Sequence, residues 1–143
     1  MIKSLLALAI LTMGLVTGAC GSTSAAADPP VALGQGDDGR TISVARGTVI
    51  ELTLQNSFGP PGSSLTWDAV SSDAAVLTRS AVRLDPASSA GPMLQGTQRY
   101  IADFRAAASG SARIVATGTR RCEAMNPAFC HGTTMSVTVT VTG

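Results

Sequence analysis

The sequence predicts an all-β protein, an antiparallel β-sandwich of about seven strands. Apolar and polar residues alternate with a period of two in segment after segment, whereas no segment sustains the period of a helix. Clusters of Gly, Pro and Ser separate these segments in the manner of turns. About seven short strands in roughly 100 residues is the pattern of two sheets packed through their inward-facing side chains.

The N-terminus has the organisation of a bacterial lipoprotein signal peptide. Lys3 supplies a positive charge, and residues 5–16 form an apolar run. That run is too short to span a bilayer, which takes about 20 residues. It ends on Thr-Gly-Ala-Cys, which resembles the lipobox, where the peptide is cut before a lipidated cysteine. We therefore expect residues 1–19 to be removed and Cys20 to anchor the protein to the outer face of the bacterial cell membrane or in the cell envelope. An ordinary secretory signal cut after Ala27 is the alternative.

Residues 20–39 are expected to be a flexible tether, because they are rich in small and polar residues and have no hydrophobic periodicity. They contain Gly34-Gln-Gly-Asp-Asp-Gly39, formally a G-x-G-x-x-G motif. A dinucleotide site requires this motif between a strand and a helix. Here a tether precedes it and a β-type segment follows, so we interpret it as a spacer. The globular domain is then residues 40–143.

Alternation defines the expected strands of this domain. They are residues 41–44, 49–55, 65–69, 76–77, 81–84, 98–105, 112–117 and 135–142, of which the last alternates most regularly. Ile101 is an apolar exception on the outer face of its strand. Trp67 lies early in the third strand, where immunoglobulin-like sandwiches keep a buried tryptophan. Residues 86–96 show no strand pattern and are expected to form a long loop.

Charge and cysteine content limit the possible functions. Lys3 is the only lysine, so the chain without its signal peptide balances nine arginines against nine acidic residues. A neutral surface gives no basis for nucleic-acid binding. With Cys20 lipidated, Cys122 and Cys130 remain as a pair in an oxidising compartment, so we expect a disulfide. The alternative is a metal site of both cysteines and His131, which lacks a fourth ligand and a known spacing.

The sequence offers little to an enzyme. His131 is the only histidine, so a Ser-His-Asp triad would depend on it alone, and no G-x-S-x-G motif is present. We expect no catalysis and no cofactor, and place the function on loops held by the rigid sandwich. Three loops have unusual compositions: residues 56–64, 86–96 and 120–134. Phe58 and Phe129 are either exposed contact residues there or lids packed on the core, and the sequence leaves both interpretations open.

Several motifs occur in the order found in a known family. Residues 39–52 fit the pattern G-x-x-I-x-V-x-x-G-x-x-I-x-L, and Asn56 and Trp67 match the ends of N-P-[ST]-T-G-[YF]-x-W across a longer loop. Ser72-Asp73 precedes Val76-Leu77, Gly96 to Tyr100 matches G-x-x-x-[FW] with Tyr for Phe, and residues 108–114 contain the expected glycine turn. On these motifs, residues 39–143 resemble the chagasin-type inhibitors of papain-like cysteine proteases.

The resemblance implies an immunoglobulin-like sandwich, expected to be monomeric, whose three loops at one end block the active-site cleft of a protease. By position, it implies these loop residues: Asn56, Ser57, Phe58, Ser63, Ser64, Leu65 and Trp67 in the first; Gly91 and Gly96 in the second; Arg120, Arg121, Glu123 and Phe129 in the third. This sequence departs from the family where Ser57 replaces Pro and Cys122 replaces Trp. A cysteine-closed lobe is also inserted in the third loop. These departures motivate the alternative function, a non-inhibitory adhesion or binding module for another envelope protein.

Overall fold

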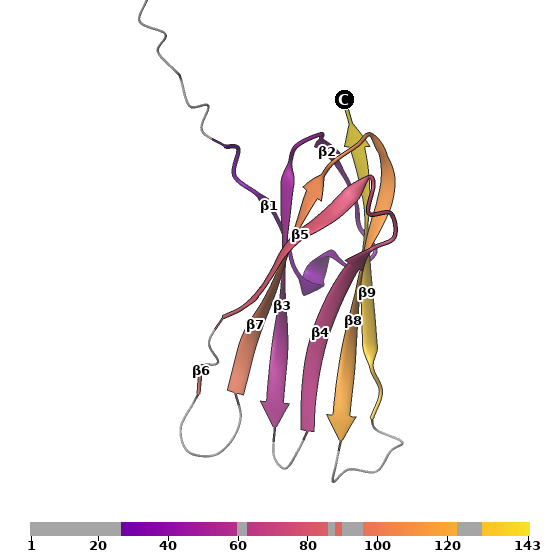
Figure 1. The fold of residues 1–143 in the computed structure, drawn as a ribbon. Helices are drawn as coiled ribbons and strands as arrows, with labels where there is room; N and C mark the ends of the chain where they lie inside the picture. Colours follow the sequence, from indigo (N-terminus) through magenta and orange to yellow (C-terminus); the bar gives the residue numbers. More distant parts are fainter. Residues whose placement is uncertain (1–26, 60–62, 86–87, 90–95, 123–129) are drawn as a thin grey trace, which may run out of the picture.

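The computed structural model describes residues 27–59, 63–85, 88–89, 96–122 and 130–143. Apart from one short 3-10 turn, every regular element in this part of the chain is a β-strand (Figure 1). The elements are β1 (Val31–Leu33), η1 (Gln35–Asp37), β2 (Thr41–Ala45), β3 (Val49–Gly59), β4 (Ser63–Ser71), β5 (Leu77–Leu84), β6 (Ser88–Ser89), β7 (Gly96–Ala106), β8 (Gly110–Cys122) and β9 (Thr133–Thr142). The all-β prediction is confirmed. Within these residues no helix has the length and apolar character needed to cross a membrane.

The strands form two layers that are joined at one hairpin. Neighbouring strands follow the order β2-β9-β8-β4-β3-β7-β5. Between β3 and β4, however, the pairing covers only the rungs from Ser57–Leu65 to Gly59–Ser63. Beyond these rungs β3 continues along β7 and β4 continues along β8. The sheet therefore folds into one layer of β5, β7 and β3 and another of β4, β8, β9 and β2 (Figure 1), which is the predicted sandwich.

Period-two alternation produces the core between the layers. Its principal side chains are Ile50, Leu52, Leu54, Trp67, Ala69, Tyr100, Ala102, Phe104, Ile114, Ala116, Met135, Val137, Val139 and Val141. Burying one large apolar side chain stabilises a fold by about 1.5–3 kcal/mol. Ile101, the predicted exception on the outer face, lies outside this core cluster but is nevertheless only 6% exposed.

One predicted pair of short strands is a single strand. Residues 76–77 and 81–84 were expected to be separate, but Leu77–Leu84 forms β5, with a register shift between Arg79 and Ala81. A β-bulge at this point interrupts the alternation, which is why the sequence pattern divides there. Val82 and Leu84 are exposed on this edge strand, so their apolar character does not indicate that they are buried.

Other strand predictions need smaller corrections. Within the expected loop of residues 86–96, Ser88 and Ser89 pair with β7 as β6. Most of the longer strands extend past their predicted ends, because backbone pairing continues after the apolar alternation stops. Two strand pairs, β1 with β3 and β2 with β9, are parallel rather than antiparallel.

The prediction that residues 20–39 are all tether is wrong for residues 31–39. β1 pairs with Ile50 to Leu52 of β3, along the edge of β3 that β4 leaves free. Leu33 is 5% exposed and belongs to the core cluster. The G-x-G-x-x-G sequence forms η1 and the turn into β2, inside the domain. A three-residue strand with one buried leucine is too short to produce a detectable period.

Asp37 stabilises this N-terminal turn. Its Oδ2 accepts a hydrogen bond of 2.8 Å from the backbone N–H of Gly34, and its other carboxylate oxygen pairs with Arg40. These contacts, the one with Gly34 first, lower the pKa of Asp37 below its ordinary value of 3.8.

We expect the Asp37→Asn variant to be less stable than the natural protein at pH 6 but equally stable near pH 2. A lowered folded-state pKa contributes stability above the unfolded pKa, near 3.8, and this stability is lost as the pH falls through the folded pKa. Urea unfolding at both pH values measures the difference. A gap that persists unchanged at pH 2 would show that the Asp37 charge is not its source.

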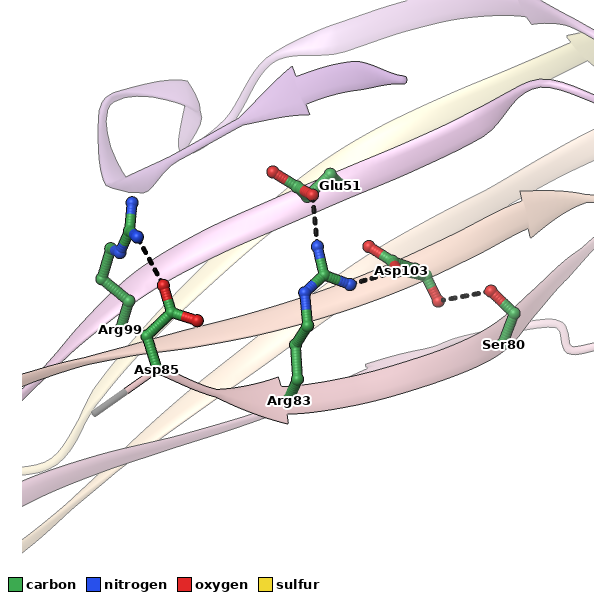
Figure 2. Close-up of polar contacts among 6 residues, drawn as sticks. All are labelled: Glu51, Ser80, Arg83, Asp85, Arg99 and Asp103. Atoms are coloured by element: carbon green, nitrogen blue, oxygen red, sulfur yellow. Dashed lines mark hydrogen bonds and ion pairs between the residues drawn. The ribbon is translucent and has the colours of Figure 1, made fainter. Parts of the chain in front are cut away.

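A charged network on the outer face of the first layer holds the edge strand β5. Glu51 of β3 and Asp103 of β7 are register partners, so their carboxylates would repel each other. Figure 2 shows Arg83 of β5 between them, paired with both. Its hydrogen bond with Asp103 is the main cause that raises the pKa of Arg83. A second ion pair, Arg99 with Asp85, lies at the end of β5 (Figure 2).

We expect Arg83→Gln to lower the free energy of unfolding, since it leaves two carboxylates facing each other without a cation. The matched control is Arg105→Gln on β7, because Arg105 is exposed and forms no ion pair with a described residue. Urea unfolding at low salt measures both variants. Equal effects of the two substitutions would contradict a specific role for Arg83.

Candidate functional site

The three unusual loops leave the sandwich at the same end. The β3–β4 hairpin closes at the pair Gly59–Ser63, and Ser63 is also the register partner of Cys122, the last residue of β8. On the other side of β3, Phe58 pairs with Gly96, where β7 begins after the second loop. The strand ends that border the loops are therefore neighbours, as Figure 1 shows. The remaining residues of these segments, 60–62, 86–87, 90–95 and 123–129, lie outside the described residues.

The first loop presents an aromatic side chain to solvent. Phe58 is 36% exposed, so it is available for contact and is not a lid on the core. Ser57 beside it is exposed, and Ser63, Ser64 and Leu65 across the hairpin are half-buried. Phe129, the other aromatic residue predicted for this end, lies outside the described residues.

Asn56 and Trp67, which the resemblance places with the first loop, are supports beneath it, and Trp67 is buried as the immunoglobulin-like pattern predicts. Trp67 is 7% exposed and Asn56 is 3% exposed, so neither offers a surface to a partner. Asn56 Oδ1 accepts a hydrogen bond of 2.9 Å from the backbone N–H of Trp67. The indole N–H of Trp67 donates to the carbonyl oxygen of Gln55 at 3.1 Å. These bonds join β3 and β4 just beyond their last backbone pair.

Tyr100 extends this seam between the layers, and sequence reasoning did not identify its role. Its hydroxyl oxygen accepts a hydrogen bond of 2.9 Å from the backbone N–H of Ala69 and donates one of 3.3 Å to Asp68. Burial is the main cause that raises the pKa of Tyr100. The backbone N–H groups of Trp67 and Ala69, which would pair with β3 in a flat sheet, thus donate to side chains instead. A buried tyrosine needs a hydrogen-bond partner for its hydroxyl group. This requirement was the one sequence signal that could have indicated the role of Tyr100.

The second loop is described only at β6 and at Gly96, and the third only at its base. Gly96 begins β7 and is half-buried, while Gly91 lies outside the described residues. Arg120 and Arg121 are exposed at the end of β8, and Glu123 lies outside the described residues. The predicted disulfide between Cys122 and Cys130 is confirmed, with 6.0 Å between the Cα atoms.

The described part of the site suits recognition of a protein surface. It presents a phenyl ring, serine hydroxyl groups and arginine side chains, which can contact a partner without covalent chemistry. His131 is exposed next to the disulfide. No group of three or more His, Cys, Asp or Glu side chains in the described residues can hold a metal ion, and both cysteines of the considered metal site are in the disulfide.

Comparison with solved structures finds similar proteins of known structure. The cysteine protease inhibitor EhICP2 from Entamoeba histolytica has a TM-score of 0.59 and 13% sequence identity, over 78% of this chain and 95% of that chain. Amebosin has a TM-score of 0.54 and 20% identity, over 80% and 99%. PbICP-C, solved in complex with falcipain-2, has a TM-score of 0.47 and 15% identity, over 78% and 99%.

The first two similarities confirm the predicted fold class. The likeness to a cysteine protease inhibitor that the motifs predicted is thus confirmed at the level of the fold. No protein-family model matches this sequence, and neither does any curated protein sequence.

Proposed function

We propose that this chain is a membrane-tethered inhibitor of papain-like cysteine proteases, which blocks the active-site cleft with the three loops at one end of the sandwich. The observation that carries the proposal is the convergence of the three loop bases on one row of strand ends, next to the exposed ring of Phe58. The shared fold with EhICP2, itself a cysteine protease inhibitor, supports it.

The position of the N-terminal segment supports a tether. Val31 pairs with Ile50, and β3 runs from there to Gly59 at the loop end, about 30 Å away at 3.3 Å per residue. Since β1 is parallel to β3, the chain enters the sandwich near the end opposite the loops (Figure 1). The 11 residues from Cys20 to Val31 reach at most about 40 Å. An anchor at Cys20 is therefore attached to the end of the sandwich opposite the loops, so that the loop end can face away from the membrane.

Titration of papain and cathepsin L with residues 27–143 tests inhibition. We expect tight inhibition without cleavage of the chain, weakened about tenfold by Phe58→Ser because an aromatic contact is lost. Val70→Ser is the matched control, since Val70 is also an exposed apolar residue, 48% exposed, and lies near the opposite end of β4. No inhibition of either protease at micromolar concentration would contradict the proposal.

The tether has a separate test. The full chain expressed in a bacterium that processes lipoproteins is expected in the membrane fraction, and Cys20→Ser is expected to release it, because a stable anchor needs two or more acyl chains. A Cys20→Ser chain that stays in the membrane fraction after signal cleavage would contradict lipid anchoring.

A second candidate function rests on the third loop. The Cys122–Cys130 disulfide closes a lobe that is inserted relative to the family motifs. The loops can therefore instead serve a non-inhibitory contact with another envelope protein. Cross-linking of the membrane-anchored chain separates the two functions. A specific partner that is not a protease, together with no inhibition, would favour the binding module.

A further inference from the structure

The third loop is held differently on its two sides. The β8–β9 ladder ends at the pair Gly118–Thr133, but β8 continues along β4 as far as the pair Cys122–Ser63. Residues 119–122 are thus fixed by backbone pairing with β4. Residues 130–132, which we call the return segment, belong to no strand.

The disulfide is the covalent constraint on the return segment. It joins Cys130, the first residue of this segment, to Cys122 on the fixed side. At the other end of the segment, a Cβ atom on Gly132 would lie 2.9 Å from the carbonyl oxygen of Gly118, so the chain passes close to β8 there. Both cysteines are half-buried, which leaves the bond open to a thiol from solvent. Breaking the bond therefore removes the covalent link between the return segment and β8, and no strand pair of the sandwich depends on that link.

We infer that the Cys122–Cys130 disulfide is a redox switch for the return segment: the oxidised chain is the strong inhibitor and the reduced chain a weak one. This inference rests on the proposed inhibitory function. The reductant is a dithiol, such as a thioredoxin-like protein. Its thiolate attacks one sulfur to form a mixed disulfide, and its second thiol then releases the chain. Two electrons pass to the disulfide, the reductant becomes a disulfide, and two protons complete the thiols of Cys122 and Cys130.

The chemistry of the target gives this switch a direction. A cysteine protease needs its catalytic thiol reduced, because oxidation of that thiol removes the nucleophile. Reducing conditions therefore sustain the protease and also release the return segment of the inhibitor. Oxidising conditions keep the return segment constrained, so that less ordering is needed when it binds.

The test compares inhibition constants of the full chain for papain that has been activated and then freed of thiol under argon. We expect the oxidised chain to bind about ten times more tightly than the same chain treated with dithiothreitol. The double variant Cys122→Ser/Cys130→Ser is expected to have the inhibition constant of the reduced chain, and dithiothreitol is expected not to change it. Fluorescence of the buried Trp67 reports whether each form is folded, and mass spectrometry counts the free thiols.

Each outcome decides a different point. Equal inhibition by the oxidised and fully reduced folded chains would overturn the switch and leave the inhibitory function standing. A disulfide that resists dithiothreitol in the folded chain would also overturn the switch. No inhibition by the oxidised chain would overturn the proposed function and the switch with it. If the double variant does not fold, the oxidised and reduced natural chains still give the answer.

Discussion

We expect Gly118→Val to lower the free energy of unfolding by about 3 kcal/mol, because overfilling a packed site is destabilising. Gly118 is buried in β8 at its last pair with β9. A Cβ atom there would lie 2.8 Å from Cγ2 of Thr133, 3.0 Å from Cδ1 of Leu65 and 3.3 Å from Cε2 of Trp67. Three neighbours on both adjacent strands would have to move, and one of them is the core indole.

Gly36→Val is the matched control for this substitution. Gly36 is exposed in η1, and a Cβ atom on it would meet nothing within 4 Å. Urea unfolding, followed by Trp67 fluorescence, measures both variants. Similar losses for the two would mean that the intrinsic cost of replacing glycine, rather than crowding at β8, causes the effect.

The strands that bury one face regularly could be predicted from the sequence. In β9, Met135, Val137, Val139 and Val141 are buried, whereas the residues between them are half-buried. Because burial alternates along the strand, apolar and polar residues alternate in the sequence with a period of two. This period can be recognised without any knowledge of long-range contacts. The same reasoning found β3, β7 and most of β8.

Features that depend on a contact between distant segments could not be predicted in this way. β1 exists because β4 leaves an edge of β3 open, and a three-residue segment carries no period of its own. The bulge in β5 is visible only in its register with β7. The crowding around Gly118 comes from β4 and β9, and the sequence shows only a glycine.

At the candidate site, the motifs located the loops but not the roles of all their residues. The conformation of a recognition loop depends on buried residues as much as on exposed ones, so a motif can include both kinds. Phe58 proved to be exposed, while Asn56 and Trp67 proved to be buried beneath it. The sequence pattern predicted a buried Trp67, but it could not assign Asn56 or Phe58, since the fold of the sheet at the β3–β4 hairpin decides which side chains face inward.

We expect Asn56→Ala to lower the free energy of unfolding by about 2 kcal/mol, because the buried N–H of Trp67 loses its acceptor. Asn56 is the only buried polar or charged residue in the described core, and its Oδ1 lies 2.9 Å from that nitrogen. Water cannot easily replace it at a position that is 3% exposed. Urea unfolding measures the loss of stability.

The same substitution is expected to weaken inhibition of papain about tenfold even where the protein is fully folded, because the bond lies next to the last backbone pair before the first loop. Gln98→Ala is the matched control: Gln98 meets the other end of the Asn56 amide, at 3.5 Å, and its loss leaves the bond to Trp67 in place. The control is expected to change stability by less than about 0.5 kcal/mol and to keep its inhibition. If Asn56→Ala lost stability but inhibited papain as well as the control, Asn56 would support the core without positioning the loop.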